Sequence, residues 1–190
     1  MQAFFEQGFG FDRVVRDVRP FLCLMALWFL VACDDQVMVE QPNSFHSDVR
    51  SVAVFARGEG DILLVVDGAE SVGSPEPVQN AVMAAMQGRP GSVNPSYTLS
   101  QGTAGQTASI VRVVLNGPKA MTGRAICRGD EAGTSESGDE TRAALAFCQG
   151  ERALSSIKGR APKASGPDDP KFTELLQTAA RELFPAPDRD

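Results

Sequence analysis

The spacing of apolar residues predicts two helices in this chain. Ser74 and Pro75 begin the first, because a hydroxyl accepts a backbone N–H left unpaired in the first turn and proline suits the first helical position. Gly88 ends it. Asp169 and Pro170 begin the second, which ends before a further proline. One face of each helix is apolar and is expected to pack in the core: Val78, Ala81, Val82, Ala85 and Met86 in the first, and Phe172, Leu175, Leu176, Ala179 and Leu183 in the second.

Shorter apolar runs, rich in β-branched residues, predict strands. They cover residues 51–56, 61–66, 97–99, 109–115, 143–148 and 152–160. The first two runs are expected to form a hairpin across the sequence RGEG, and the last two across QGE. Because the run ILLVV in the second strand does not alternate, that strand is expected to be central and covered on both faces.

The order of these elements shows no internal repeat and no regular alternation of strand and helix. It predicts an α+β fold, in which one domain has a mainly antiparallel sheet of about five to six strands and two helices packed on one face. A length of 190 residues with 43% apolar content suits a single core. The formal charge of -6 and the pI near 4.9 argue against binding to nucleic acid, which requires a basic surface.

The N-terminal part of the chain has the pattern of a secretion signal. Residues 21–32 are uncharged and mostly large and apolar, and three arginines precede them. Twelve apolar residues are fewer than the roughly 20 that a membrane-spanning helix needs, and Asp34 ends the run. The pattern therefore favours a cleaved signal over a permanent membrane span.

Leu30, Val31, Ala32 and Cys33 close the apolar run, and this sequence resembles the lipobox of bacterial lipoprotein precursors. The resemblance implies cleavage between Ala32 and Cys33 and lipid on the Cys33 thiol, where several acyl chains hold a protein firmly on a membrane. It implies an anchor facing the periplasm and says nothing of an activity. Asp34 resembles the signal that retains some lipoproteins in the inner membrane. The alternative is an ordinary cleaved signal in which Cys33 is incidental.

Three segments follow from this interpretation. Residues 1–32 are the signal peptide, residues 33–48 are a polar, flexible tether, and residues 49–190 are the α+β domain. The region before the apolar run is long for this class of signal and carries three acidic residues. We interpret the first 13 residues as an error in the assigned gene start, which N-terminal mapping of the uncleaved precursor tests.

Two cysteines, Cys127 and Cys148, remain in the folded part of the chain, because Cys23 leaves with the signal and Cys33 takes lipid. Two thiols in an oxidising compartment predict one disulfide, which would join the start of an acidic Gly/Ser loop to the next strand. Such a bridge contributes on the order of 3 kcal/mol in the chain-entropy model. The alternative is a redox or metal-binding pair, although the spacing is not that of a C-x-x-C motif.

The sequence contains no G-x-S-x-G, H-E-x-x-H, Walker A or G-x-G-x-x-G motif. The single histidine, His46, lies in the predicted tether, which argues against Ser-His-Asp and Cys-His catalysis. Ser155 and Lys158 match the S-x-x-K motif, but they fall in a predicted strand and the companion motifs are missing. We interpret this match as chance, and Arg112 as a solvated or ion-paired residue within a strand.

Two groups of carboxylates are candidate cation sites. The larger group lies in the loop between the cysteines and consists of Asp130, Glu131, Glu136, Asp139 and Glu140. It lacks the fixed spacing of a calcium loop, so a solvated acidic loop is the simpler interpretation. Asp61 and Asp67 flank a predicted strand, where they either share a site or serve as turn residues.

The sequence as a whole predicts a membrane-anchored periplasmic lipoprotein with a non-catalytic accessory, scaffold or partner-binding domain. Its expected partners are the membrane, through lipid on Cys33, and an envelope protein or other envelope component, with no cofactor and no metal. An alternative function is the binding of a small ligand or cation. A third is hydrolysis by carboxylates alone, as in glycoside hydrolases.

Overall fold

The computed structural model describes residues 36–40, 44–45, 49–87, 95–105, 108–130 and 138–184. All of them belong to one compact unit, Gln36–Asp190. The predicted signal peptide, Cys33, His46 and the predicted helix-ending residues Gly88 and Pro185 lie outside the described residues. None of the helices within the described ranges is both long and apolar enough to cross a membrane.

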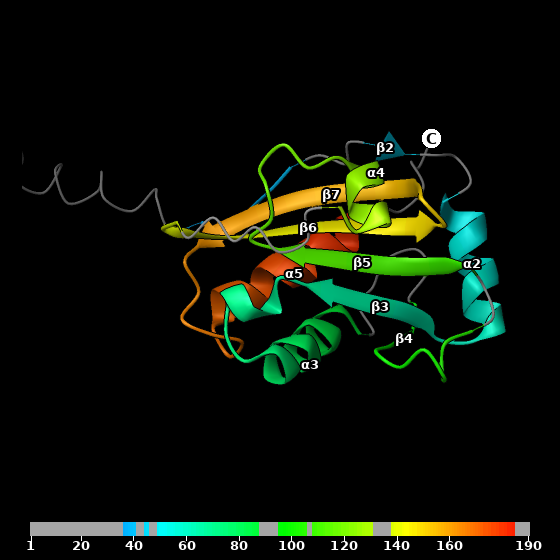
Figure 1. Ribbon diagram of the computed structural model, residues 1–190, viewed down its shortest axis with the longest axis horizontal. Coiled ribbons are helices and arrows are strands. Elements are labelled where there is room, and N and C mark those ends of the chain that lie inside the picture. Colours follow the sequence, from blue (N-terminus) through cyan, green and yellow to red (C-terminus); the bar gives the residue numbers. More distant parts are fainter. Residues whose placement is uncertain are drawn as a thin grey trace, which may run out of the picture. The chain divides into compact units, whose positions relative to one another are not determined.

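A single sheet forms the centre of the domain (Figure 1). Its strands within the described ranges are β1 (Met38–Val39), β2 (Ser44–Phe45), β3 (Ile62–Asp67), β4 (Tyr97–Thr98), β5 (Ser109–Leu115), β6 (Glu140–Gln149) and β7 (Arg152–Pro162). The strand order is β1-β7-β6-β5-β3-β4, and β2 also pairs with β7. The α+β prediction is confirmed, but the sheet is mixed, because β3 runs parallel to both β4 and β5 while the other pairs are antiparallel.

The helices within the described ranges are α2 (Val49–Glu59), α3 (Pro75–Met86), α4 (Gly123–Arg128) and α5 (Pro170–Leu183), with a 3-10 turn, η2, at Ala69–Ser71. Two of them, α3 and α5, are confirmed as predicted, and they contact each other over one face of the sheet. At the start of α5, the carboxylate of Asp169 accepts a hydrogen bond from the backbone N–H of Lys171 at 2.9 Å.

The prediction of a strand at residues 51–56 is wrong, and so is the hairpin that would join it to β3. This segment is helix α2, whose buried residues Val49, Ala53 and Ala56 lie three or four positions apart. The β-branched residues of the run favour a strand locally, but core packing selects the helix. Val54 and Phe55, the residues between the buried positions, are 58% and 64% exposed.

The position predicted for β3 also needs correction. It lies between β5 and the two-residue strand β4, next to the edge of the sheet, and Leu63 and Val65 on one face are only partly buried. Helix α3 connects the end of β3 to the start of β4. It returns the chain to the end of the sheet at which β3 begins, so β4 runs parallel to β3. An uninterrupted apolar run does not reveal this arrangement.

The sheet begins within the segment predicted to be a flexible tether. In β1, Met38 lies opposite Arg160 of β7, and in β2, Ser44 lies opposite Ser156. Of these two strands, β1 therefore pairs with the C-terminal part of β7 and β2 with its middle.

Two apolar clusters pack against opposite faces of the sheet. The larger one includes Leu145 and Phe147 of β6 with residues from α2, α3 and α5. The smaller one lies beneath α4 and contains Val114, Met121, Ile126, Cys127, Ala146 and Cys148. Successive residues of β6 alternate between the two clusters, as expected for a strand covered on both faces.

Candidate functional site

A disulfide joins Cys127 to Cys148, with the two Cα atoms 5.6 Å apart. The predicted bridge is thereby confirmed, and Cys127 lies in the last turn of α4, directly before the acidic loop. The bridge therefore connects this helix to the end of β6, within the smaller apolar cluster. It holds α4 against the face of the sheet opposite α3 and α5.

Helix α4 was not predicted from the sequence, because its six residues are too few to show an apolar period. Local signals for it exist at both ends. The Thr122 side chain accepts a hydrogen bond from the N–H of Ala125 at 3.2 Å, and Gly129 ends the helix in the left-handed region at φ 75°.

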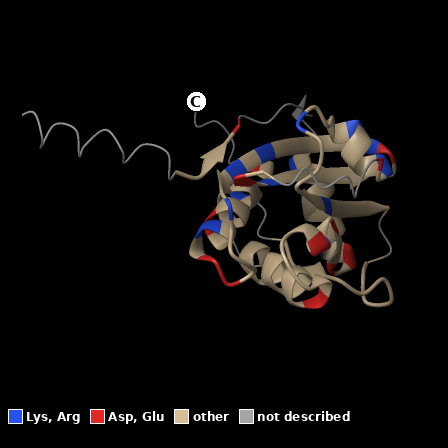
Figure 2. Ribbon diagram, turned by 60° about the vertical axis from the view of Figure 1, so that its left-hand side comes forward, with Lys and Arg blue, Asp and Glu red and all other residues tan. Residues whose placement is uncertain are grey.

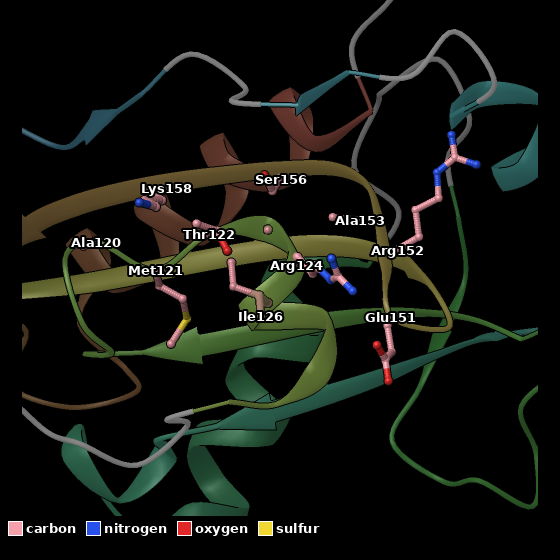
Figure 3. A pocket seen from close by; sticks show the side chains of 11 residues that line it. Ala120, Met121, Thr122, Arg124, Ile126, Glu151, Arg152, Ala153, Ser156 and Lys158 are labelled. Atoms are coloured by element: carbon pink, nitrogen blue, oxygen red, sulfur yellow. The ribbon is translucent and has the colours of Figure 1, made fainter.

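A cavity of about 590 Å³ lies between α4 and β7, and we call it the distal groove (Figure 3). Its basic side chains are Arg124 of α4 and Arg152 and Lys158 of β7, and its carboxylate is Glu151 of the hairpin turn. The remaining lining is small or apolar: Ala120, Met121, Thr122, Gly123, Ile126, Ala153 and Ser156. In the view of Figure 3, Lys158 lies near one end of the groove, Arg152 near the other, and Arg124 between them.

A second cavity of about 390 Å³ shares Lys158 with the first. We call it the proximal groove because it includes β1, the described strand nearest to Cys33 in the sequence. Its charged residues are Lys119, Arg142, Lys158 and Arg160, with Glu40 and Glu140. Glu140 lies 3.5 Å from the Arg160 guanidinium and 4.0 Å from that of Arg142. The ammonium of Lys158 donates to the backbone carbonyl of Lys119 at 3.0 Å, which fixes its position between the two grooves.

Both grooves carry more basic than acidic side chains, in a chain whose formal charge is -6. The distal groove has three basic residues and one carboxylate, and the proximal groove has four and two. In Figure 2, Lys and Arg residues, coloured blue, occur at several positions on the strands of the sheet. Together the grooves form a basic track along β7, on the face of the sheet that α4 covers in part.

The sequence pattern does not reveal this track, because its basic residues come from β6, β7, α4 and the segment before α4. A partial signal was present. Lys158 and Arg160 are two positions apart in a strand, so they share a face, and Arg160 lies opposite Arg142 in the neighbouring strand.

Ser155 and Lys158 do not form a catalytic pair. Ser155 is fully buried on the α5 side of β7, where its hydroxyl donates to the carbonyl of Leu183 at 2.9 Å. Lys158 is directed to the opposite face, into the grooves. Two side chains that are three residues apart in a strand lie on different faces, so the S-x-x-K match has no catalytic geometry here.

Arg112 forms an ion pair with Asp67 at 3.6 Å. Of the two roles predicted for it, solvated or ion-paired, the structure shows the ion pair. Burial raises the pKa of Asp67, and the Arg112 charge opposes that shift, while nearby Glu70 adds to it. Asp61 does not join this pair. It lies before the first residue of β3 and Asp67 is the last, so the strand separates the two carboxylates.

The acidic loop is described only in part, because Glu131 and Glu136 lie outside the described residues. Of the other members, Asp130 pairs with Arg128, and Glu140 pairs with Arg142 and Arg160. Within the described ranges, no three histidine, cysteine or carboxylate side chains gather as a metal site would require.

We expect Gly129→Ala to destabilise the domain more than Gly150→Ala. Both glycines have positive φ, which costs an alanine about 1–2 kcal/mol. A β-carbon at position 129 would also overlap the Arg112 guanidinium, which Asp67 holds in place, whereas position 150 is open. Thermal unfolding of the two variants measures the difference, and equal losses would contradict the close contact between α4 and Arg112.

No protein-family model matches the sequence. A search of curated proteins also gives no match. Among solved structures, the chain is similar to the PelC dodecamer from Paraburkholderia phytofirmans, with 12% identity over 79% of this chain and 99% of that chain, and a TM-score of 0.43. A variant of the PelC dodecamer from that organism matches with 10% identity over 79% and 98% of the two chains, and a TM-score of 0.39.

Proposed function

We propose that the protein is a lipid-anchored envelope protein whose domain acts by binding an acidic partner protein, without catalysis. The lipobox ending in Cys33 supports the anchor, and the Cys127–Cys148 disulfide suits the oxidising compartment in which such an anchor would place the domain. The proposed binding site is the distal groove.

The observation that carries this proposal is the basic track on an acidic protein. From Lys158 to Arg152, β7 extends for about 20 Å, at roughly 3.3 Å per residue. A basic groove of this length, with small residues such as Gly123 and Ala153 between its charged ends, suits an extended segment with several carboxylates. Complementary charge on a partner accelerates association and excludes wrong partners.

We expect Arg124→Glu to weaken the binding of a polyglutamate peptide about three- to tenfold at low salt. Exposed ion pairs are worth about 0.2–1 kcal/mol each, and charge reversal replaces attraction with repulsion. Fluorescence anisotropy with a labelled peptide measures the affinity, which should also fall as salt is raised.

The matched control is Arg181→Glu, an identical charge change at an exposed position of α5, on the other side of the sheet. It should leave the peptide affinity nearly unchanged. Equal affinities for the two variants would contradict binding in the distal groove. If the protein bound polygalacturonate more tightly than polyglutamate, the partner would be an acidic polysaccharide and not an acidic protein.

The size of the distal groove also favours a second candidate function, the binding of a small anionic ligand. A volume of about 590 Å³ lies in the range of small-molecule sites, roughly 300–1,000 Å³. Thermal unfolding in the presence of di- and tricarboxylates tests this function. Stabilisation that Arg124→Glu abolishes would support it, and an unchanged melting temperature would argue against it.

A further inference from the structure

The short connection between Cys33 and β1 limits how far the domain extends from its anchor. Met38 lies five positions after Cys33, and five extended residues span at most about 18 Å. Met38 pairs with Arg160 near the C-terminal end of β7. A lipid on Cys33 therefore keeps this end of the sheet close to the membrane surface, whereas α2 and the β6–β7 turn lie at the other end (Figure 1).

The proximal groove is the surface at this membrane-near end. It includes β1 itself, and its four basic side chains outnumber its two carboxylates. Arg160 has a side chain that is 57% exposed, and Lys119 is also exposed. Beside them, the apolar side chain of Met38 is 54% exposed and lies 3.5 Å from the Arg160 guanidinium. Exposed cations next to an exposed apolar side chain suit a lipid headgroup layer.

We infer that the proximal groove binds the headgroups of anionic phospholipids and thereby sets the orientation of the domain on the membrane. This inference rests on the lipid anchor proposed above. A chain with a formal charge of -6 is repelled by an anionic surface in most orientations, so a basic surface beside the anchor favours one of them.

This orientation has a consequence for the partner site. The distal groove continues from Lys158 away from β1 towards Arg152 at the β6–β7 turn. With the proximal groove against headgroups, the distal groove extends from the membrane surface outward and stays open to a partner. The basic track is then divided between lipid and partner at Lys158.

The test uses the full lipidated protein, purified from membranes and reconstituted on vesicles of phosphatidylcholine, alone or mixed with phosphatidylglycerol. Acylation of Lys119 is followed by mass spectrometry, with Lys171 of α5 as an internal control. We expect Lys119 to react about fivefold more slowly on the anionic vesicles, because attraction to an anionic surface changes an equilibrium of one basic side chain by about that factor. Lys171 should react equally on both types of vesicle.

Charge reversal separates a headgroup contact from simple crowding at the surface. Arg160→Glu should restore the reactivity of Lys119 on anionic vesicles, whereas Arg181→Glu should not. Equal labelling of Lys119 on both vesicle types, for protein that floats with the vesicles, would overturn the headgroup contact and leave the anchor standing. Protein that does not float at all would overturn the anchor and, with it, this inference.

Discussion

Phe147→Ala should lower the free energy of unfolding by about 3–5 kcal/mol. Phe147 is fully buried in β6, and its ring packs edge-on against that of Phe184, with centroids 5.1 Å apart. Alanine removes this contact and leaves a cavity between the sheet and α5. Urea unfolding followed by circular dichroism measures the loss.

Phe55→Ala is the matched control, because it deletes the same group from a side chain that is 64% exposed. We expect a change within about 0.5 kcal/mol, as for most surface substitutions. If both variants lost the same stability, Phe55 would also be packed, and the position of α2 would be wrong. A loss below about 1 kcal/mol for Phe147→Ala would contradict its place in the core.

Removal of the disulfide, by the double substitution Cys127→Ala and Cys148→Ala, should cost on the order of 3 kcal/mol. The two residues are 21 positions apart, and closing a loop of this length restricts the unfolded chain by about that amount. Both residues are buried in the smaller apolar cluster, one in α4 and one in β6, so the native state also loses packing there. Thermal unfolding of the variant and of the reduced wild-type protein measures the effect, and both should be destabilised.

The same substitution has an expected effect on binding. Helix α4 supplies Gly123, Arg124 and Ile126 to the distal groove, and the disulfide holds that helix against β6. Loss of the bridge should therefore weaken polyglutamate binding at temperatures well below unfolding. Unchanged affinity in a destabilised variant would show that the apolar contacts of Ile126 suffice to keep α4 in place.

Much of the fold followed from local pattern. Helix α5 combines a capping Asp169, a proline in its first turn and a complete apolar stripe, and all these signals agree. The β6–β7 hairpin was equally clear, since its strands flank a glycine turn in which Gly150 has positive φ. Where several local preferences point to one element, the sequence is sufficient.

The errors arose where local preference and tertiary packing disagree. Helix α2 contains a β-branched run that favours a strand, but its buried positions match a helix. Strand β3 was expected in a hairpin and instead pairs with two parallel strands, β4 and β5, and α3 makes the connection to β4. Sequence spacing contains no information on which distant strand will be the neighbour.

One part of the candidate site could be predicted from the sequence and the other could not. The pairing of Cys127 with Cys148 followed from counting cysteines in an oxidising compartment, without knowledge of the fold. The basic track did not, because Arg124, Arg152 and Arg160 have no common spacing along the chain. Charges from separate elements become one surface only when the sheet is assembled.

The sequence by itself determined the α+β class, two helices, the β6–β7 hairpin and the disulfide, and it predicted a lipid anchor at Cys33. These features depend on short-range chemistry: apolar period, capping, turns, cysteine number and a four-residue motif. Only the tertiary structure decided the parallel pairing of β3, the docking of α4 and the basic track along β7. Each of these joins residues far apart in the chain, where the free energy of packing, and not local preference, selects the neighbours.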